Sequence, residues 1–265
     1  MLLVLKFGGG EGIDLESLSK NVAKLQNSDT KIVVVVGANA ELSRVQKERG
    51  IEPKMITSER GEKSRWTDEA TLGLLKEVYG DTAEKVADEI NKSGGTALGQ
   101  IASQDNLVIA KQHGRMRIVE DGKVKVVDGD LTGSIEKVAA EKISKILDSK
   151  KILVLAPPAA TEAGAEVNVD GDKIAAKVAV ELKTDKLIFF ANTPGLLENV
   201  ADESSLIREI PIAQADEFAV GRMKKKILSA KRAIEAGVGE VIFADGRLAE
   251  NPIDAALSGN GTRVF

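Results

Sequence analysis

The stretch Lys6–Gly12 (Lys-Phe-Gly-Gly-Gly-Glu-Gly) directly follows an apolar run that is typical of a strand. Glycines in such a place expose backbone amides and let an anion approach the chain closely. Lys6 adds a positive charge beside them. The stretch therefore fits a phosphate-binding turn and, equally well, a tight strand-to-helix turn that merely needs glycine. Neither the P-loop pattern nor the dinucleotide pattern G-x-G-x-x-G occurs here.

Three further turns combine glycine with polar residues. Gly37–Ala40 follows a second strand-like run and opens a helix, whose N-terminus attracts anions, although an ordinary loop would look the same. Asn168–Lys173 leads into another helix, and Asp172 could cap that helix or orient a lysine or a bound metal. Gly221–Lys226 puts cations at a helix start, where they oppose the helix dipole unless a polyanion lies nearby. A solvated charged face is the alternative there.

Two single residues could also take part in binding. Arg65 precedes a predicted helix, and its guanidinium could recognise a carboxylate in a bidentate manner, although the residue by itself favours a surface salt bridge. His113 is the only histidine and lies in the polar stretch Lys111–Arg115. We predict that it is a surface loop residue and not a catalytic one.

The composition excludes several kinds of chemistry. The chain has 265 residues, of which 43% are hydrophobic and 29% charged, and its net charge is −4. It has no cysteine, which excludes disulfides, thiolate metal sites and cysteine nucleophiles, and one histidine cannot form a multi-histidine metal site. The acidic balance argues against nucleic-acid binding. No apolar run is long enough to span a membrane and no signal peptide is evident, so we expect a cytoplasmic protein.

The apolar pattern indicates the scaffold that must position these groups. Short runs rich in Val, Ile and Leu predict buried strands at Leu2–Phe7, Lys31–Gly37, Ile152–Ala156, Leu187–Ala191 and Glu240–Ala244. Amphipathic segments predict helices at Leu15–Gln26, Glu41–Arg49, Asp68–Tyr79, Thr82–Lys92, Ser134–Asp148, Lys173–Leu182 and Met223–Ala236. The alternation implies a largely parallel sheet with helices on both faces.

Smaller features refine this scaffold. Arg115–Val119 and Lys123–Val127 are expected to form a β-hairpin across Glu120-Asp121-Gly122. Thr67 is placed to cap the helix that follows it, and Gly237 suits the C-terminus of the last long helix.

Taken together, these stretches resemble the amino acid kinase family, which includes acetylglutamate kinase and aspartokinase. Lys-x-Gly-Gly, a glycine turn after the second strand, Asn-x-Asp-Gly-Asp and Met-x-x-Lys occur in that family's order. Within the family, the chain is most similar to the kinases that act on aminoadipyl groups attached to the carrier protein LysW. That likeness covers essentially the whole chain and rests on Gly9–Ile13, Ser64–Asp68, Asn192–Leu197, Gly221–Lys226, Phe243–Arg247 and Leu257–Thr262.

The resemblance implies an α/β fold, a three-layer αβα sandwich with a mainly parallel central sheet. It implies an acceptor-binding and dimerisation lobe over residues 1–170 and a nucleotide-binding lobe over 171–265, within one structural unit. By the same resemblance, Lys6 and Lys226 would flank the transferring phosphoryl group, and Asp172 would orient both lysines.

The resemblance also implies three sets of binding residues. The phosphate-binding set consists of Gly8, Gly9, Gly37 and Ala38. The acceptor would be held by Arg65 and Asn168. The nucleotide site would be lined by Asn192, Pro194, Gly195, Leu196, Gly221, Arg222, Met223 and Lys224. No protein ligand set for a metal ion is predicted.

The implied activity is an ATP-dependent kinase. It would phosphorylate the terminal carboxylate of an aminoadipyl or glutamyl group on an acidic carrier protein, using ATP with Mg²⁺, in lysine or arginine biosynthesis. A carboxylate with a pKa of about 4 is already ionised at neutral pH, so no general base is needed. A homodimer is expected, with neither nucleic acid nor membrane as a partner. The alternatives are a free acetylglutamate kinase and a non-catalytic nucleotide or metabolite sensor.

The chain departs from the family pattern in its first half. The turn after the second strand usually reads His-Gly-Gly followed by Gly or Ser, but here it reads Val36-Gly37-Ala38-Asn39, and Ala38 lacks the freedom to take a positive φ. Gly80–Glu84 replaces an expected Gly-x-x-Asn-Lys pattern, and Gln100–Asp105 replaces a glycine-rich loop. These differences predict an altered acceptor or a weakened enzyme.

An acidic carrier would need a local basic patch on this net-negative chain. Two sets of cations could form one, with scattered solvated charges as the alternative. The first set is Lys54, Arg60, Lys63 and Arg65, and the second is Lys111, Arg115 and Arg117.

Overall fold

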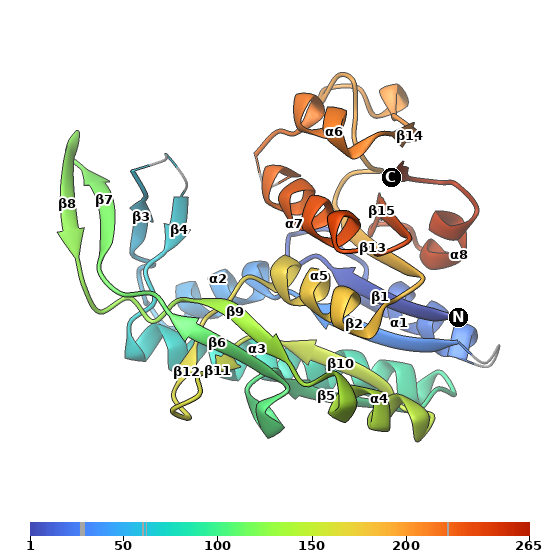
Figure 1. Cartoon of the computed structure of the whole chain (residues 1–265), viewed down its shortest axis with the longest axis horizontal. Coiled ribbons are helices and arrows are strands. Elements are labelled where there is room, and N and C mark those ends of the chain that lie inside the picture. The colour runs from blue at the N-terminus through green and yellow to red at the C-terminus, as the bar shows by residue number, and fades with distance from the viewer. Residues whose placement is uncertain (27–29, 60, 62, 222) are drawn as a thin grey trace.

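The fold is described from a computed structural model that covers residues 1–26, 30–59, 61, 63–221 and 223–265. Its centre is an eight-stranded sheet in the order β14-β16-β15-β13-β1-β2-β10-β5 (Figure 1). Its strands are β1 (Leu2–Phe7), β2 (Lys31–Val36), β5 (Ala97–Ile101), β10 (Ile152–Ala156), β13 (Lys186–Ala191), β14 (Glu209–Ile210), β15 (Glu240–Asp245) and β16 (Thr262–Val264). Neighbouring strands are parallel except at β15–β16.

Helices cover both faces of this sheet because both faces of its inner strands are apolar. On β1, Val4 belongs to one hydrophobic cluster, whereas Leu3 and Leu5 belong to the other. The first cluster is covered by α4 (Ala140–Asp148), α5 (Gly171–Leu182) and α7 (Met223–Glu235). The second is covered by α1 (Leu15–Gln26), α2 (Asn39–Glu48), α3 (Glu69–Lys92) and α8 (Pro252–Leu257).

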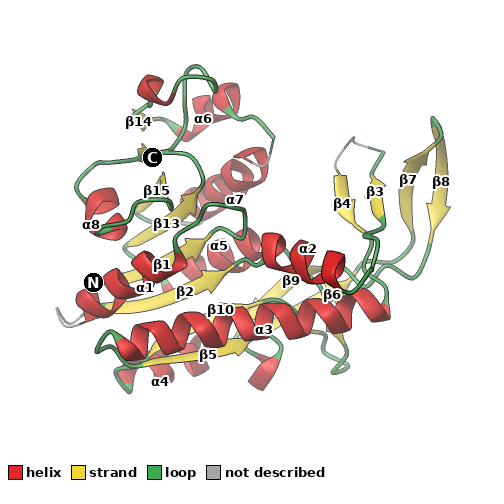
Figure 2. Cartoon of the chain, turned by 180° about the vertical axis from the view of Figure 1, so that it is seen from behind, coloured by secondary structure: helices red, strands yellow, loops and turns green. Residues whose placement is uncertain are grey.

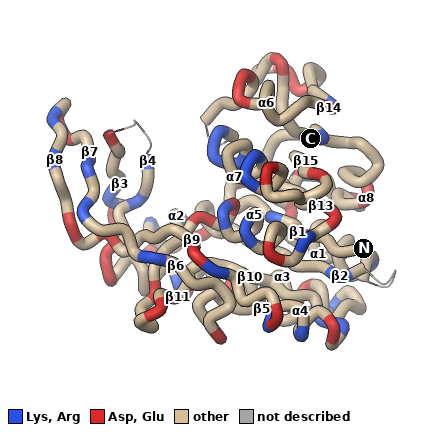
Figure 3. Tube along the Cα trace, viewed as in Figure 1, with Lys and Arg blue, Asp and Glu red and all other residues tan. Residues whose placement is uncertain are grey.

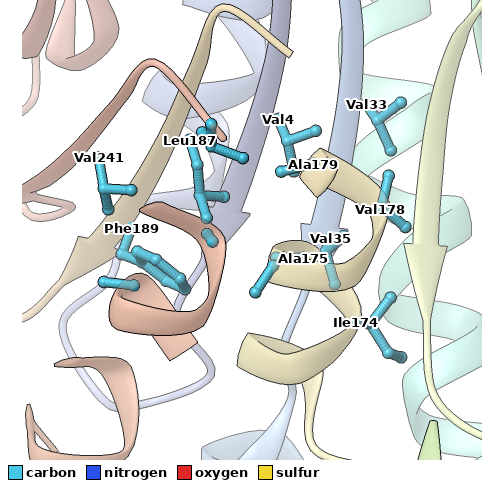
Figure 4. Packing of buried hydrophobic residues seen from close by; sticks show 14 of the residues in the cluster. Val4, Val33, Val35, Ile174, Ala175, Val178, Ala179, Leu187, Phe189 and Val241 are labelled. Atoms are coloured by element: carbon cyan, nitrogen blue, oxygen red, sulfur yellow. The ribbon is translucent and has the colours of Figure 1, made fainter. Parts of the chain in front are cut away.

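Close packing of α5 on the sheet illustrates the first cluster. Ile174 and Val178 of α5 lie over Val33 and Val35 of β2 (Figure 4). These side chains are fully buried. The predicted three-layer αβα sandwich with a mainly parallel sheet is confirmed.

Smaller strands lie beside the sandwich. A second sheet has the order β12-β11-β6-β9. Two hairpins, β3–β4 and β7–β8, stand side by side away from the helical layers (Figures 1 and 2), and a bridge between Ser58 and Ile118 joins them. The bounds are β3 (Met55–Thr57), β4 (Lys63–Arg65), β6 (Val108–Gln112), β7 (Met116–Glu120), β8 (Lys123–Val127), β9 (Gly133–Val138), β11 (Ala159–Ala160) and β12 (Glu166–Val167). Short helical turns are α6 (Ile212–Ala215), η1 (Gln104–Asn106), η2 (Glu203–Ser205) and η3 (Asp216–Phe218).

The structure confirms the predicted buried strands and the β7–β8 hairpin, with ends shifted by at most one residue. Gly237 follows α7 with a φ of +95°, as its predicted role at the helix end requires. Among the described residues, no helix is long and apolar enough to cross a bilayer.

Three local predictions were wrong. Ser134–Asp148 is not one helix, because its first part forms β9 and pairs with β6. The helices predicted at 68–79 and 82–92 are one helix, α3, which runs through Gly80. The cap of α3 is not Thr67, because the Asp68 carboxylate accepts from the Thr71 amide at 2.8 Å.

The continuity of α3 through Gly80 has a packing reason. A side chain at Gly80 would contact Ile101 of β5 at 3.6 Å, so this face of the helix lies against the strand. Gly99 of β5 allows a closer approach, because a Cβ there would lie 2.4 Å from the Ala83 carbonyl oxygen. The tertiary contact therefore outweighs the helix-breaking tendency of glycine.

Candidate active site

Lys6, Asp172 and Lys226 meet in one buried cluster at the carboxyl end of the central strands. Lys226 Nζ donates to both carboxylate oxygens of Asp172, at 3.0 and 2.9 Å. Lys6 Nζ lies 3.6 Å from Asp172 Oδ1 and donates to the Phe7 carbonyl oxygen at 2.7 Å. The side chains of Lys6 and Asp172 are only 5% and 12% exposed. Three elements far apart in sequence, β1, α5 and α7, therefore bring one carboxylate between two ammonium groups.

Burial and the charges of its own members set the electrostatics of this cluster. Burial lowers the pKa of Lys6, against the attraction of Asp172, while Lys226 lowers it further. Burial also opposes the ionisation of Asp172, but Lys226 and Lys6 outweigh it and hold the pKa of that carboxyl below its usual value. Two ammonium groups thus share the Asp172 carboxylate in a site with little water, and Asp170 also attracts Lys6. An anion there would meet weak solvent screening.

Asp172 orients these lysines from inside α5 and does not cap the helix. The Asp170 carboxylate accepts from the Asp172 amide at 2.8 Å and is the N-cap. The capping function predicted for Asp172 is therefore taken by Asp170. The Asp172 carboxylate is left for the lysines.

The two glycine turns abut each other beside Lys6. A Cβ at Gly9 would lie 2.4 Å from the Gly37 carbonyl carbon, and a Cβ at Gly37 would lie 3.1 Å from Lys6 Nζ. Both positions therefore need glycine for this close approach. The two turns therefore place their backbone next to the Lys6 side chain.

The backbone amides of these two turns differ in whether they already donate a hydrogen bond within the protein. The Gly8 amide donates to the Phe190 carbonyl at 3.0 Å, and the Gly37 amide donates to the Phe7 carbonyl at 2.9 Å. The extension of the sheet thus already uses the Gly8 and Gly37 amides, and their contact with phosphate stays a prediction. In the part of the chain that the structure describes, no protein acceptor contacts the amides of Gly9 and Ala38. These two stay as the predicted phosphate donors.

Ala38 carries no backbone strain. Its φ is −137° and its ψ is 31°, so the backbone does not need the positive φ that glycine would allow. Its methyl group is buried in the second hydrophobic cluster. Next to it, Asn39 begins α2 and accepts from the Tyr79 hydroxyl at 2.9 Å, which anchors this helix start. The predicted weakening of the turn by Ala38 therefore has no conformational basis here.

The two predicted acceptor-binding residues lie on different elements. Arg65, on β4, donates to the Gln46 side chain and to Ser43 Oγ at 3.2 Å, both on α2. Burial lowers the pKa of its guanidinium, and no described carboxylate forms an ion pair with it. Asn168 follows β12, and its Nδ2 donates to Thr67 Oγ1 at 3.3 Å. Arg65 thus keeps an uncompensated charge that suits a carboxylate.

The predicted nucleotide-binding residues fall into separate groups. Asn192, Pro194 and Gly195 follow the carboxyl end of β13. Leu196 is 1% exposed and packs in the first hydrophobic cluster, and its contact with the nucleotide stays a prediction. A Cβ at Gly195 would lie 2.4 Å from Thr262 Oγ1, which explains the glycine.

The other nucleotide-binding predictions lie at the start of α7. Gly221 has a φ of +56°, Met223 begins the helix, and Lys224 is exposed in its first turn. Arg222 lies outside the described residues. Lys226 lies one helical turn after Met223, and its hydrogen bond to the Asp172 carboxylate connects this segment to the lysine cluster.

His113 is exposed, as predicted, although it is not isolated. Its Nδ1 lies 3.1 Å from Thr132 Oγ1 and its Nε2 lies 2.7 Å from Ser134 Oγ. Burial and then the charge of Lys173 lower its pKa. No hydrogen bond among the described residues joins it to Lys6 or Lys226, and its lack of a catalytic function stays a prediction.

Two charged groups were missed from the sequence. Asp130 is a buried carboxylate, 2% exposed, that accepts from the Thr67 amide. Arg247 donates to Asp245 and to Glu203, and thereby ties together the loops that follow β15 and β13. The only sequence signal for Asp130 was that the polar segment Asp128-Gly129-Asp130 precedes a strand. Burial, which distinguishes Asp130, cannot be seen in one sequence.

Comparison with known proteins agrees with this geometry. The sequence profile of the Amino acid kinase family matches residues 1–245. A LysW-aminoadipate kinase of Thermus thermophilus is 38% identical over 269 residues, covering 99% of this chain and 100% of that protein. A LysW-aminoadipate kinase of Deinococcus radiodurans is 41% identical over 267 residues, covering 99% and 91%. This chain therefore belongs to the amino acid kinase family.

A solved structure supports the fold. The N-acetylglutamate synthase of Neisseria gonorrhoeae, in complex with coenzyme A and N-acetyl-glutamate, superposes with a TM-score of 0.80 at 24% identity. The match covers 99% of this chain and 59% of that longer chain.

Proposed function

We propose that this protein transfers the γ-phosphoryl group of ATP to the terminal carboxylate of an aminoadipyl or glutamyl group carried by an acidic LysW-type protein. The product would be an acyl phosphate in lysine or arginine biosynthesis. The observation that carries the proposal is the buried Lys6–Asp172–Lys226 cluster beside the unpaired amides of Gly9 and Ala38. The names of the relatives support the acceptor class.

The reaction needs placement of charge more than proton transfer. A carboxylate oxygen of the acceptor forms a bond to the γ-phosphorus while the bond to the ADP bridging oxygen breaks, and no proton moves. Lys6 and Lys226 would face the oxygens on which charge develops. Asp172 would hold both ammonium groups at a fixed spacing.

Magnesium would enter with the nucleotide as part of the substrate. Asp172, the carboxylate nearest the lysines, is already engaged by both of them. Within the described residues, no group of three or more His, Asp or Glu side chains is arranged to hold a metal ion. The phosphate oxygens of ATP are therefore the natural ligands of Mg²⁺ here.

The acceptor would approach from the side of the hairpins. Arg65 would bind a second carboxylate of the aminoadipyl group, and Asn168 would contact its polar atoms. Arg65 fits this function because its partly buried guanidinium contacts only neutral groups among the described residues. A carboxylate of the acceptor would supply the negative partner that the Arg65 guanidinium lacks among the described residues.

The proposal is tested by trapping the product with hydroxylamine, which converts an acyl phosphate into a hydroxamate. The acceptors are aminoadipyl-carrier, glutamyl-carrier and free acetylglutamate, each with ATP and Mg²⁺. We expect hydroxamate with a carrier-bound acceptor and not with acetylglutamate. Hydroxamate from free acetylglutamate alone would favour an acetylglutamate kinase, whereas nucleotide binding without turnover would favour a sensor.

The first basic patch is the better candidate for docking the carrier. In the second patch, Arg115 pairs with Asp128 at 3.6 Å and Arg117 pairs with Glu59 at 3.0 Å. In the first patch, Lys54 lies 4.6 Å from the centre of the Trp66 ring. No described acidic residue forms an ion pair with Lys54 or Lys63, although Lys54 attracts Asp68 and Glu120 electrostatically. Arg60 lies outside the described residues. Basic residues on these hairpins are visible in Figure 3.

Reversing the charge of this patch is expected to weaken carrier binding. We predict that Lys54→Glu with Lys63→Glu raises the KM for the carrier about tenfold at low salt, because rim charges act mainly by steering and attraction. The KM for ATP should not change. The control is Lys145→Glu, which reverses one charge at an exposed position of α4 outside the patch. If the double variant leaves the KM for the carrier unchanged at low salt, this patch does not dock the carrier.

We also propose that the enzyme is cytoplasmic. It would form a homodimer in which β5 pairs with a second copy of the chain. β5 is the last strand of the central sheet, and Leu98 on it is 37% exposed. Its sequence, Ala-Leu-Gly-Gln-Ile, has no charge or proline to block pairing with a second copy. Light scattering should give twice the chain mass of 28.1 kDa, and Leu98→Lys should lower it. A single-chain mass for the wild type at micromolar concentration would contradict the dimer.

A further inference from the structure

Asp130 lies in the connection between β8 and β9 and is almost completely buried, with 2% exposure. One of its carboxylate oxygens accepts from the Thr67 amide at 2.8 Å, and the other accepts from the Thr132 hydroxyl. No described lysine or arginine forms an ion pair with it. A buried carboxylate held only by neutral donors costs stability, so its presence needs a reason.

Thr67 connects this carboxylate to Asn168. The Thr67 side chain is fully buried, and its Oγ1 accepts from Asn168 Nδ2 at 3.3 Å. The Thr67 carbonyl accepts from the Leu131 amide at 2.7 Å, and the Leu131 carbonyl accepts from the Asn168 amide at 2.8 Å. The connection that carries Asp130 is therefore bonded to Thr67 on one side and to Asn168 on the other.

The same carboxylate fixes the end of β4. Thr67 stands two residues after Arg65, and its hydroxyl contacts the Arg65 carbonyl at 3.4 Å. Asp68 then caps α3. Because the Asp130 carboxylate holds the Thr67 amide, it sets where β4 stops and where the Arg65 backbone lies.

We infer that Asp130 is a positioning residue for acceptor recognition, fixing the spacing between Arg65 and Asn168. The inference rests on the proposed function, in which these two residues hold the acceptor. No hydrogen bond or ion pair in the described chain joins Asp130 to Lys6, Asp172 or Lys226. Its effect should therefore appear in acceptor binding and not in nucleotide binding.

The test compares three variants with the carrier-bound acceptor. Asp130→Ala removes both bonds, and we expect it to raise the acceptor KM about tenfold or more, in line with the loss of hydrogen bonds to a charged group. kcat and the KM for ATP should stay within about twofold. Asp130→Asn should recover most of the affinity, because its amide oxygen can still accept from the Thr67 amide. Asp88→Ala, at an exposed position of α3 that forms no ion pair among the described residues, should behave as the wild type.

Each outcome decides between the inference and its alternatives. An equal rise in both KM values, or a fall in kcat alone, would assign Asp130 a general structural function and overturn the inference. An unchanged acceptor KM in Asp130→Ala would overturn it directly. If that variant does not fold, Thr132→Val removes one bond and should raise the same KM by a smaller factor. A wild type that forms no hydroxamate would overturn the proposed function instead, before any variant is compared.

Discussion

Lys226→Met is expected to lower kcat for hydroxamate formation at least a hundredfold while changing the KM for ATP only a few-fold. Lys226 donates to Asp172 from the first turns of α7, in a site where little water can replace its charge. Removing one pre-organised donor from a developing negative charge typically costs about a hundredfold to a thousandfold in rate. Single-turnover rates with saturating ATP and acceptor measure the effect on the chemical step.

The matched control is Lys225→Met, the neighbouring lysine. Its side chain is exposed, whereas that of Lys226 is 12% exposed. We expect the control to keep the wild-type rate within about twofold, since an exposed cation is screened by solvent. Equal losses in both variants would indicate that the charge of the helix start matters in general and would contradict the specific placement of Lys226.

Asp172→Asn is expected to impair both activity and stability. In the folded protein, the carboxylate lies between Lys6 and Lys226, and its loss leaves two buried cations facing each other. Breaking a buried ion pair by removing one partner costs about 3–5 kcal/mol in unfolding free energy. kcat should fall about a hundredfold or more because the lysines lose their common anchor. Urea unfolding and single-turnover kinetics measure the two effects on the same preparation.

The pH dependence of this stability difference has a defined sign. The pKa of Asp172 is held below its ordinary value of 3.8 in the folded protein. The carboxylate therefore stabilises the fold at pH values above that ordinary value, and this contribution is lost as the pH falls through the lower folded value. The wild type and Asp172→Asn should differ most at neutral pH and converge in acid. Equal unfolding free energies at pH 7 would show that the cluster does not depend on the charge of Asp172.

The scaffold could be predicted from the sequence because its signals are local. Runs such as Lys31–Val36 are apolar on both faces, as a strand covered by two helical layers must be. The Asp121-Gly122 turn fixed the β7–β8 hairpin, and both residues take positive φ. The predictions failed where partners distant in sequence decide, as in β9, whose hydrogen bonds go to β6.

The site was predicted in outline and corrected in detail for the same reason. Lys6, Asp172 and Lys226 do converge in the structure. Their grouping was predicted from the resemblance to a family and could not have been predicted from their spacing in the sequence. The spacing alone could not show that the Gly8 and Gly37 amides are used by neighbouring strands. Nor could it show that Asp130 is buried against Thr67. Amide availability and burial are properties of the folded packing.

The structure explains how the chain accommodates its departures from the family pattern in residues 1–170. Ala38 fits its backbone without strain, and Asn39 is anchored by Tyr79. Gly80 lies inside a continuous helix. These changes leave the Lys6–Asp172–Lys226 cluster intact, which favours a working phosphotransferase over a sensor.

The most direct measurement follows the label of γ-³²P-ATP in a single turnover with aminoadipyl-carrier. We predict that the label appears on the carrier, is released by hydroxylamine, and is absent both with Lys6→Met and with carrier that lacks the aminoadipyl group. Label that appears only as inorganic phosphate, or that reaches the carrier equally well without Lys6, would contradict phosphoryl transfer to the carried carboxylate by this cluster.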